Sequence, residues 1–207
     1  MGSRYAANAG RAPRSEPASR ELQNRARIAD LAARFIVEHG LGDWSLAKRK
    51  AARQLMLTQR HALPGDDEIE TALIAHQALF GGDAHAASLR RQRTEALRWM
   101  RDLASFEPVL TGGVAAGWAG EHSDIRLELV ADDAKAVELA LINRNVAYRA
   151  GPESPHATAE LHVDAPAGVL RLIVRTSAMA RQRPRRDRHG REEPRLDADA
   201  VAELLKS

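Results

Sequence analysis

The spacing of apolar residues changes once along this chain, close to Pro108, and this change constrains the fold more than any other feature. Before Pro108, apolar residues recur every three or four positions, which is typical of amphipathic helices. After it, apolar and polar residues alternate in short runs separated by proline and glycine, which is typical of strands. A helical region followed by a sheet-containing part predicts an α+β fold.

Four helices are expected before Pro108, over about residues 20–40, 45–60, 66–80 and 84–105. The third follows a Pro64-Gly65 turn and ends at Gly81-Gly82, and both are common helix boundaries. One face of the fourth helix carries the apolar residues Leu89, Ala96, Met100 and Leu103. These apolar stripes, together with Trp44 and Trp99, are most simply explained as core.

Strands dominate the expected structure after Pro108. They are predicted over residues 109–111, 125–130, 146–149, 158–163 and 169–175. An amphipathic helix capped by Asp133 is expected between the second and third strands, and a short final helix is expected over about 197–205. Mixed strand and helix patterns of this size predict a small mixed-sheet α/β domain.

The chain therefore divides into four expected parts. Residues 1–19 are predicted to form a disordered arm, because a Gly, Ala, Ser, Pro and Arg composition buries too little apolar surface to offset ordering. Residues 20–107 form the helical region, and residues 108–178 form the α/β domain. Residues 179–207 contain an arginine-rich loop and the last helix.

Composition limits the chemistry that the chain can perform. It contains no cysteine, so any metal must bind to carboxylates, carbonyls or histidines, which favours a hard cation such as magnesium. No stretch approaches the roughly 20 apolar residues of a membrane helix, and the first residues lack the apolar run of a signal peptide. We therefore expect a cytoplasmic protein with no membrane partner.

The most informative segment runs from Leu110 to Val130. It contains Leu110-Thr-Gly-Gly-Val-Ala-Ala-Gly117, followed by Glu121-His-Ser-Asp-Ile-Arg-Leu-Glu-Leu-Val130. Since side chains alternate across a strand, Asp124, Arg126 and Glu128 are expected on one face and the intervening apolar residues in the core. The two glycines, Gly112 and Gly113, would let the backbone approach a phosphate closely.

This segment resembles the signature of the nucleotidyltransferase superfamily related to DNA polymerase beta. In that family a strand ends in Gly-Ser or Gly-Gly, a short helix follows, and a second strand carries Ser-Asp-x-Asp. Here Gly112-Gly113, Gly117 and Ser123-Asp124-Ile125 match those elements. The resemblance covers the motif and, loosely, the sheet as far as Arg175, but not the preceding helices. It implies magnesium-dependent transfer of a nucleotidyl group from a nucleoside triphosphate to an unidentified acceptor.

The resemblance also implies roles for individual residues. Asp124 would bind the metal together with Glu128 or Glu160, while Gly112 and Gly113 would lie along the phosphates. The family's second aspartate is replaced here by Arg126, a permanent cation, which should weaken a two-metal site but could stabilise developing charge. Glu160 is preferred as the third carboxylate because it lies nearer the middle of its strand than Asp164. The simpler alternative is that these acidic residues are solvated or form surface ion pairs.

A second interpretation stays open, in which the domain is catalytically degraded and binds a nucleotide, RNA or a protein partner. Nucleic acid could contact the arginine-rich loop or the arm through phosphates. The arginines concerned are Arg181, Arg183, Arg185, Arg186, Arg188, Arg191 and Arg195 in the loop and Arg4, Arg11 and Arg14 in the arm. Aromatic residues make up only 4% of the chain, however, so base stacking is not offered, and a solvated loop is the simpler explanation.

Overall fold

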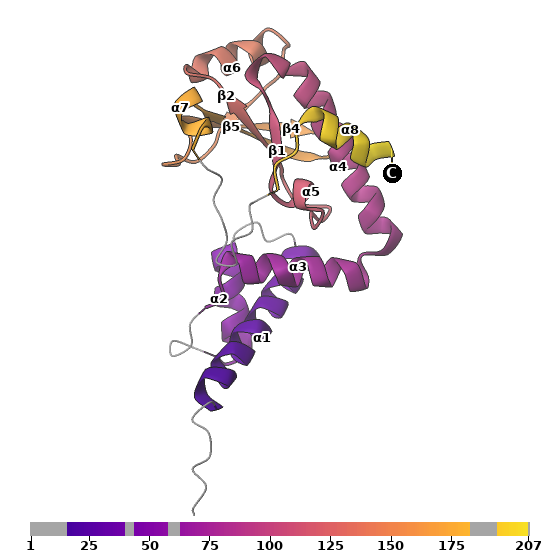
Figure 1. The fold of residues 1–207 in the computed structure, drawn as a ribbon, viewed down its shortest axis with the longest axis vertical. Helices are drawn as coiled ribbons and strands as arrows, with labels where there is room; N and C mark the ends of the chain where they lie inside the picture. The colour runs from indigo at the N-terminus through magenta and orange to yellow at the C-terminus, as the bar shows by residue number, and fades with distance from the viewer. Residues whose placement is uncertain (1–15, 40–43, 58–62, 183–193, 207) are drawn as a thin grey trace, which may run out of the picture.

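A computed structural model of the chain describes residues 16–39, 44–57, 63–182 and 194–206. Figure 1 shows two parts, with the first helices of the chain at one end and a sheet with its covering helices at the other. The α+β fold class predicted from the sequence is confirmed. Within the described ranges, no helix combines the length and apolar character needed to cross a membrane.

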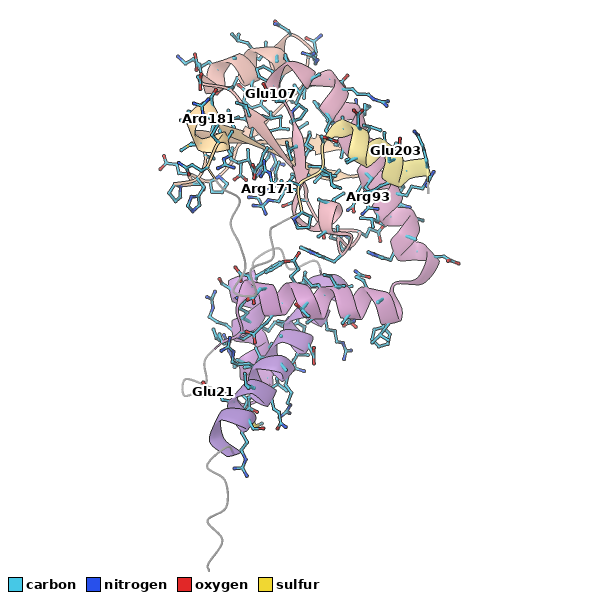
Figure 2. All side chains as sticks on the ribbon, in the orientation of Figure 1. Glu21, Arg93, Glu107, Arg171, Arg181 and Glu203 are labelled. Carbon is cyan, nitrogen blue, oxygen red and sulfur yellow. The ribbon has the colours of Figure 1, made fainter. Side chains whose placement is uncertain are left out.

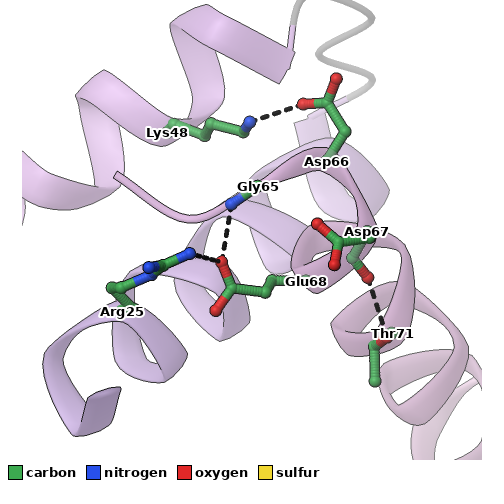
Figure 3. Close-up of polar contacts among 7 residues, drawn as sticks. All are labelled: Arg25, Lys48, Gly65, Asp66, Asp67, Glu68 and Thr71. Carbon is green, nitrogen blue, oxygen red and sulfur yellow. Dashed lines mark hydrogen bonds and ion pairs between the residues drawn. The ribbon is translucent and has the colours of Figure 1, made fainter. Parts of the chain in front are cut away.

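The first three helices, α1 (Glu16–His39), α2 (Trp44–Gln54) and α3 (Asp66–Phe80), share their own apolar core. Its centre is rich in alanine, which lets the helices approach closely, and includes Ile28, Ala32, Ala33, Ala47, Ala51, Ile69 and Leu73. Polar contacts connect the start of α3 with α1 and α2 (Figure 3). Glu68 accepts from Arg25 Nη2 and from the Gly65 N–H, each at 2.6 Å, while Lys48 pairs with Asp66.

Two helix boundaries differ from those expected. Helix α1 begins at Glu16, within the segment expected to be an arm, and residues 1–15 lie outside the described part. The second helix ends at Gln54 and not near residue 60, because Met56 adopts a left-handed backbone with φ of 56° that ends helical hydrogen bonding. Residues 58–62 are also outside the described ranges.

The sheet contains β1 (Val109–Thr111), β2 (Ile125–Val130), β3 (Arg149–Ala150), β4 (Ala159–Ala165) and β5 (Gly168–Arg175). Their spatial order is β1-β2-β5-β4-β3, with β2 and β5 parallel and the other pairs antiparallel. The expected strand over 146–149 is mostly wrong. Val146 and Tyr148 pack on the core from a loop, where the Tyr148 hydroxyl donates to Glu138 at 3.0 Å, and only Arg149 of that segment pairs with β4.

One face of the sheet is apolar and covered. It is contacted by the longer helices α4 (Gly82–Asp102), α6 (Ala134–Ile142) and α8 (Ala198–Lys206), and by the short α5 (Gly112–Ala116). The predicted apolar stripe of α4, including Met100, is buried there. By its contacts, helix α4 thus belongs to the sheet and not to the core of α1–α3. The sequence could not show this, because helical periodicity indicates which face of a helix is apolar but not what covers that face.

A tryptophan connects the two parts. Trp118, in the loop after α5, packs against the core of α1–α3, with its ring centroid 5.4 Å from that of Trp44. Its indole N–H donates to Glu70 of α3 at 2.9 Å. The loop that carries the sequence motif is therefore in direct contact with the helical part.

Candidate functional site

The opposite face of the sheet is polar and carries the predicted site residues. Along β2, the side chains of Ile125, Leu127 and Leu129 are fully buried, while Arg126 and Glu128 are half-buried on the other side. The alternation predicted for this strand is confirmed. Asp124 directly precedes β2, and 40% of its side chain is exposed.

A row of basic side chains crosses this polar face at right angles to the strands. Arg126 of β2 pairs in register with Arg171 of β5, which pairs with His162 of β4, which in turn pairs with Arg149 of β3. We call these four residues the basic row. Because neighbouring strands lie about 4.8 Å apart, the row spans about 14 Å. Figure 2 labels Arg171 of this row and Arg93 of α4, the helix that covers the opposite face.

Carboxylates border the basic row on both sides. Glu128 and Glu160 lie level with each other on one side, since both pair in register with Ile173 of β5. On the other side, Asp124 precedes Arg126 by two residues, and Asp164, two residues after His162 in β4, pairs with Val169 of β5. The row thus places three arginines and one histidine between two acidic margins.

Glu160 forms the centre of one charge cluster. Its Oε1 accepts from Arg171 Nε at 2.7 Å and lies 2.6 Å from His162 Nε2. Burial would raise the pKa of Glu160, but hydrogen bonds from His162 and Arg171 outweigh it, so the pKa lies below its usual value. Asp124 Oδ2 is 3.5 Å from another nitrogen of the same Arg171 guanidinium. Arg171 is therefore held between two carboxylates.

Glu128 forms the second cluster. Its Oε2 accepts from Arg175 at 2.9 Å and from Arg195 at 2.7 Å. Burial acts to raise the pKa of Glu128, yet the two guanidinium groups lower it below its usual value. Arg195 reaches this position because Leu196 forms paired backbone hydrogen bonds of 2.8 and 2.9 Å with Leu110 of β1. Of the other arginines in the predicted loop, only Arg181 is described, and it is exposed.

The two motif glycines are covered by side chains of the protein itself. Gly112 adopts a left-handed φ of 68°, and a Cβ there would lie 2.9 Å from Arg126 Cδ. A Cβ on Gly113 would lie 2.7 Å from the Trp118 ring. Both glycines therefore permit a close approach, as expected, but the groups that approach in this structure are Arg126 and Trp118. Contact with phosphate stays a prediction for these positions.

The three predicted metal ligands do not converge. Asp124 and Glu128 are four residues apart along an extended chain, which is about 13 Å, and Glu160 is two strands away from β2, about 10 Å. A two-metal centre needs ligands around ions only about 3.5–4 Å apart. Within the described ranges, no three acidic or histidine side chains gather closely enough to hold a metal. With Glu128 and Glu160 bound to arginines, the arrangement does not fit the magnesium centre that the resemblance implies.

The sequence prediction did not include Arg171 and Arg175 as members of this face. A signal for the two arginines was available, because alternation along Gly168–Arg175 places both opposite the buried residues of β5. The register that aligns Arg171 with Arg126 and His162 could not be obtained that way. It depends on strand partners that are distant in sequence.

No protein-family model matches the chain, and no curated protein matches it in sequence at a significant level. The nucleotidyltransferase resemblance therefore rests on the motif alone.

Proposed function

We propose that this protein binds the phosphate chain of a nucleoside triphosphate along the basic row, without transferring the nucleotidyl group. The observation that carries the proposal is the register of Arg126 with Arg171, which places two arginines on neighbouring strands of the same face, with the Arg126 side chain against Gly112. A polyphosphate between Arg126 and Arg171 would reduce the repulsion of like charges on neighbouring strands, in addition to the pairing that Glu160 and Asp124 give Arg171. Guanidinium groups also bind phosphate oxygens bidentately, which suits an extended polyphosphate.

The acidic margins support binding more than catalysis. Glu160 and Asp124 orient the Arg171 guanidinium from two sides, and Glu128 does the same for Arg175 and Arg195. Oriented guanidinium groups lose little side-chain freedom when they meet a ligand. Carboxylates used in this way are not available as anionic ligands for magnesium.

Magnesium-dependent nucleotidyl transfer to an unidentified acceptor is the second candidate. Its support is Asp124, whose carboxylate is 40% exposed and whose contact with Arg171 is a long one of 3.5 Å. In this scheme Asp124 would bind the ion, Arg126 would stabilise developing charge, and Glu128 or Glu160 would have to release its arginines. A cytoplasmic location belongs to both candidates, and the absence of cysteine is compatible with it.

Calorimetric titration with ATP, in the presence and absence of magnesium, separates the two. On the binding proposal, affinity persists without magnesium and falls about tenfold or more in Arg126→Gln, because a charge-assisted hydrogen bond contributes roughly 1.5–3 kcal/mol. Asp124→Asn should bind at least as tightly as the wild type, since it removes a negative charge beside Arg171. The matched control is Arg53→Gln, which removes one exposed arginine from α2.

The other outcomes each have a definite meaning. Binding that tightens with magnesium and loses this gain in Asp124→Asn would replace the binding proposal with nucleotidyl transfer. Equal losses in Arg126→Gln and Arg53→Gln would mean that net charge and not the basic row attracts the ligand. If inorganic triphosphate binds as tightly as ATP, the site recognises the phosphates and not the base. No binding of either ligand would defeat both nucleotide functions.

A further inference from the structure

We infer that Gln92 of α4 is a positioning residue for the basic row, because it fixes the turn from which β2 starts. The role of the row itself rests on the proposed function. The role of Gln92 in holding this turn does not, and it can be tested separately. Helix α4 lies before the motif and outside the family resemblance, so nothing in the motif points to it.

The contacts of Gln92 join both ends of one short turn. Its side chain is almost completely buried, and Nε2 donates to the carbonyl oxygens of Gly120 at 2.9 Å and Ser123 at 3.3 Å. The turn is also closed from within. The Gly120 N–H donates to Ser123 Oγ at 3.0 Å, and the Ser123 N–H donates to the Gly120 carbonyl at 3.1 Å.

This turn ends where the polar face begins. Asp124 follows it directly and contacts Arg171, and Arg126 of the basic row comes two residues later. A shift of one residue in β2 would turn Arg126 toward the apolar face, because strand side chains alternate with a period of two. A buried carboxamide that binds the last carbonyl before Asp124 thus helps to determine which residues of β2 face the ligand.

Two neighbours of Gln92 hold the preceding segment in the same manner. Arg93 Nε donates to the Val114 carbonyl at 3.2 Å, and His85 Nε2 lies 3.1 Å from the Gly117 carbonyl. Gln92, Arg93 and His85 all contact backbone oxygens, so they constrain the path of the main chain and not the conformation of a single side chain. Helix α4 therefore serves as the frame on which the motif loop is fixed.

The amide donors, and not the bulk of Gln92, are the specific feature. Its Oε1 is buried and has no hydrogen-bond partner among the described residues. An apolar side chain of similar size has no such oxygen, so it would avoid the cost of burying a polar atom without a hydrogen bond. Packing alone would be satisfied equally well by leucine, so the position favours glutamine only through the two bonds to the turn.

Hydrogen–deuterium exchange of the full-length protein tests the inference without a ligand. In Gln92→Leu, amide exchange in the peptides covering residues 120–126 should accelerate about tenfold or more, while α1–α3 should not change. Ser123→Ala opens the same turn from within and should give the same local effect, which covers the case in which Gln92→Leu does not fold. Ser88→Ala is the control, since Ser88 is buried on α4 one turn earlier and its side chain makes no hydrogen bond to the turn within the described residues.

Triphosphate affinity then connects the turn with the row. Gln92→Leu should weaken ATP binding about fivefold or more with little change in melting temperature, and its effect should be less than additive with that of Arg126→Gln. Unchanged exchange over 120–126 would overturn the inference whatever the affinity. Faster exchange with unchanged affinity, in a protein that binds ATP, would overturn it as well. If the wild type binds no ATP, the proposed function fails, and exchange alone decides the role of Gln92.

Discussion

The two faces of the sheet are built from the same strands but are stabilised in different ways. The apolar face of β2 and β5 is made of Ile125, Leu127, Leu129, Leu170, Leu172 and Val174, each 0% exposed. Between the same positions, the polar face carries charged side chains, and Arg171 and Arg175 of β5 each pair with a carboxylate of another strand. The first face needs only apolar side chains of suitable size. The second needs particular partners at particular distances.

We therefore expect the apolar face to contribute most of the stability and the polar face to carry the function. Burial of apolar area contributes about 25 cal/mol per Å², and no opposing charge term reduces it. For half-buried ion pairs, the cost of desolvation offsets much of the attraction. Each ion pair of the polar face should therefore contribute less to stability than a fully buried side chain of the apolar face.

The largest effect is expected on the apolar face. Leu127→Ala should lower the free energy of unfolding by about 2–5 kcal/mol, because the side chain is fully buried and its removal leaves a cavity. Val130→Ala, at a half-buried position of the same strand, should cost less. Urea denaturation of both variants measures the difference, and equal costs would contradict the division between the faces.

A smaller loss is expected when a polar-face cluster loses its acid. Glu128→Gln should cost about 1–3 kcal/mol, since two partly buried guanidinium groups keep only a neutral acceptor. A double-mutant cycle with Arg195→Gln isolates that pair and should show coupling. Additive effects in the cycle would mean that Arg195 and Glu128 do not interact in solution.

Acid should lower the stability that the polar face contributes. The pKa values of Glu128 and Glu160 in the folded protein lie below the usual 4.5. Their contribution to stability is therefore complete above about pH 4.5 and is lost as the pH falls through the lowered values. Scanning calorimetry between pH 6 and pH 3 should show a falling melting temperature, and the fall should be less steep in Glu128→Gln. Leu127→Ala should keep the slope of the wild type.

The smallest effect is expected at the exposed end of the basic row. Arg149 and Asp164 form an ion pair of 2.6 Å, but their side chains are 62% and 78% exposed. Asp164→Asn should change the free energy of unfolding by no more than about 0.5 kcal/mol. A loss of stability comparable with that of Glu128→Gln, measured by the same urea denaturation, would mean that the exposure of an ion pair on this face does not determine its contribution to stability.

The sequence predicted the apolar face well because its signal is local. The alternation over Ile125–Val130 shows which residues of this strand lie in the core, and capping residues and turns mark where helices and strands begin and end. The polar face depends on pairs such as Arg195 with Glu128, whose partners are 67 positions apart. Periodicity cannot show such pairs. It also cannot show that Arg126 and Trp118 occupy the space beside the motif glycines, since that follows from tertiary packing.

The hydrogen bonds between Leu196 and Leu110 also cover part of one edge of the sheet. An exposed sheet edge offers unpaired N–H and C=O groups on which a second chain can add a strand. Here β1 is an edge strand, and its central residue already exchanges both backbone bonds with the C-terminal segment. The opposite edge strand, β3, has only two residues. The same few residues that bring Arg195 to Glu128 thus also shield one edge of the sheet against edge-to-edge aggregation.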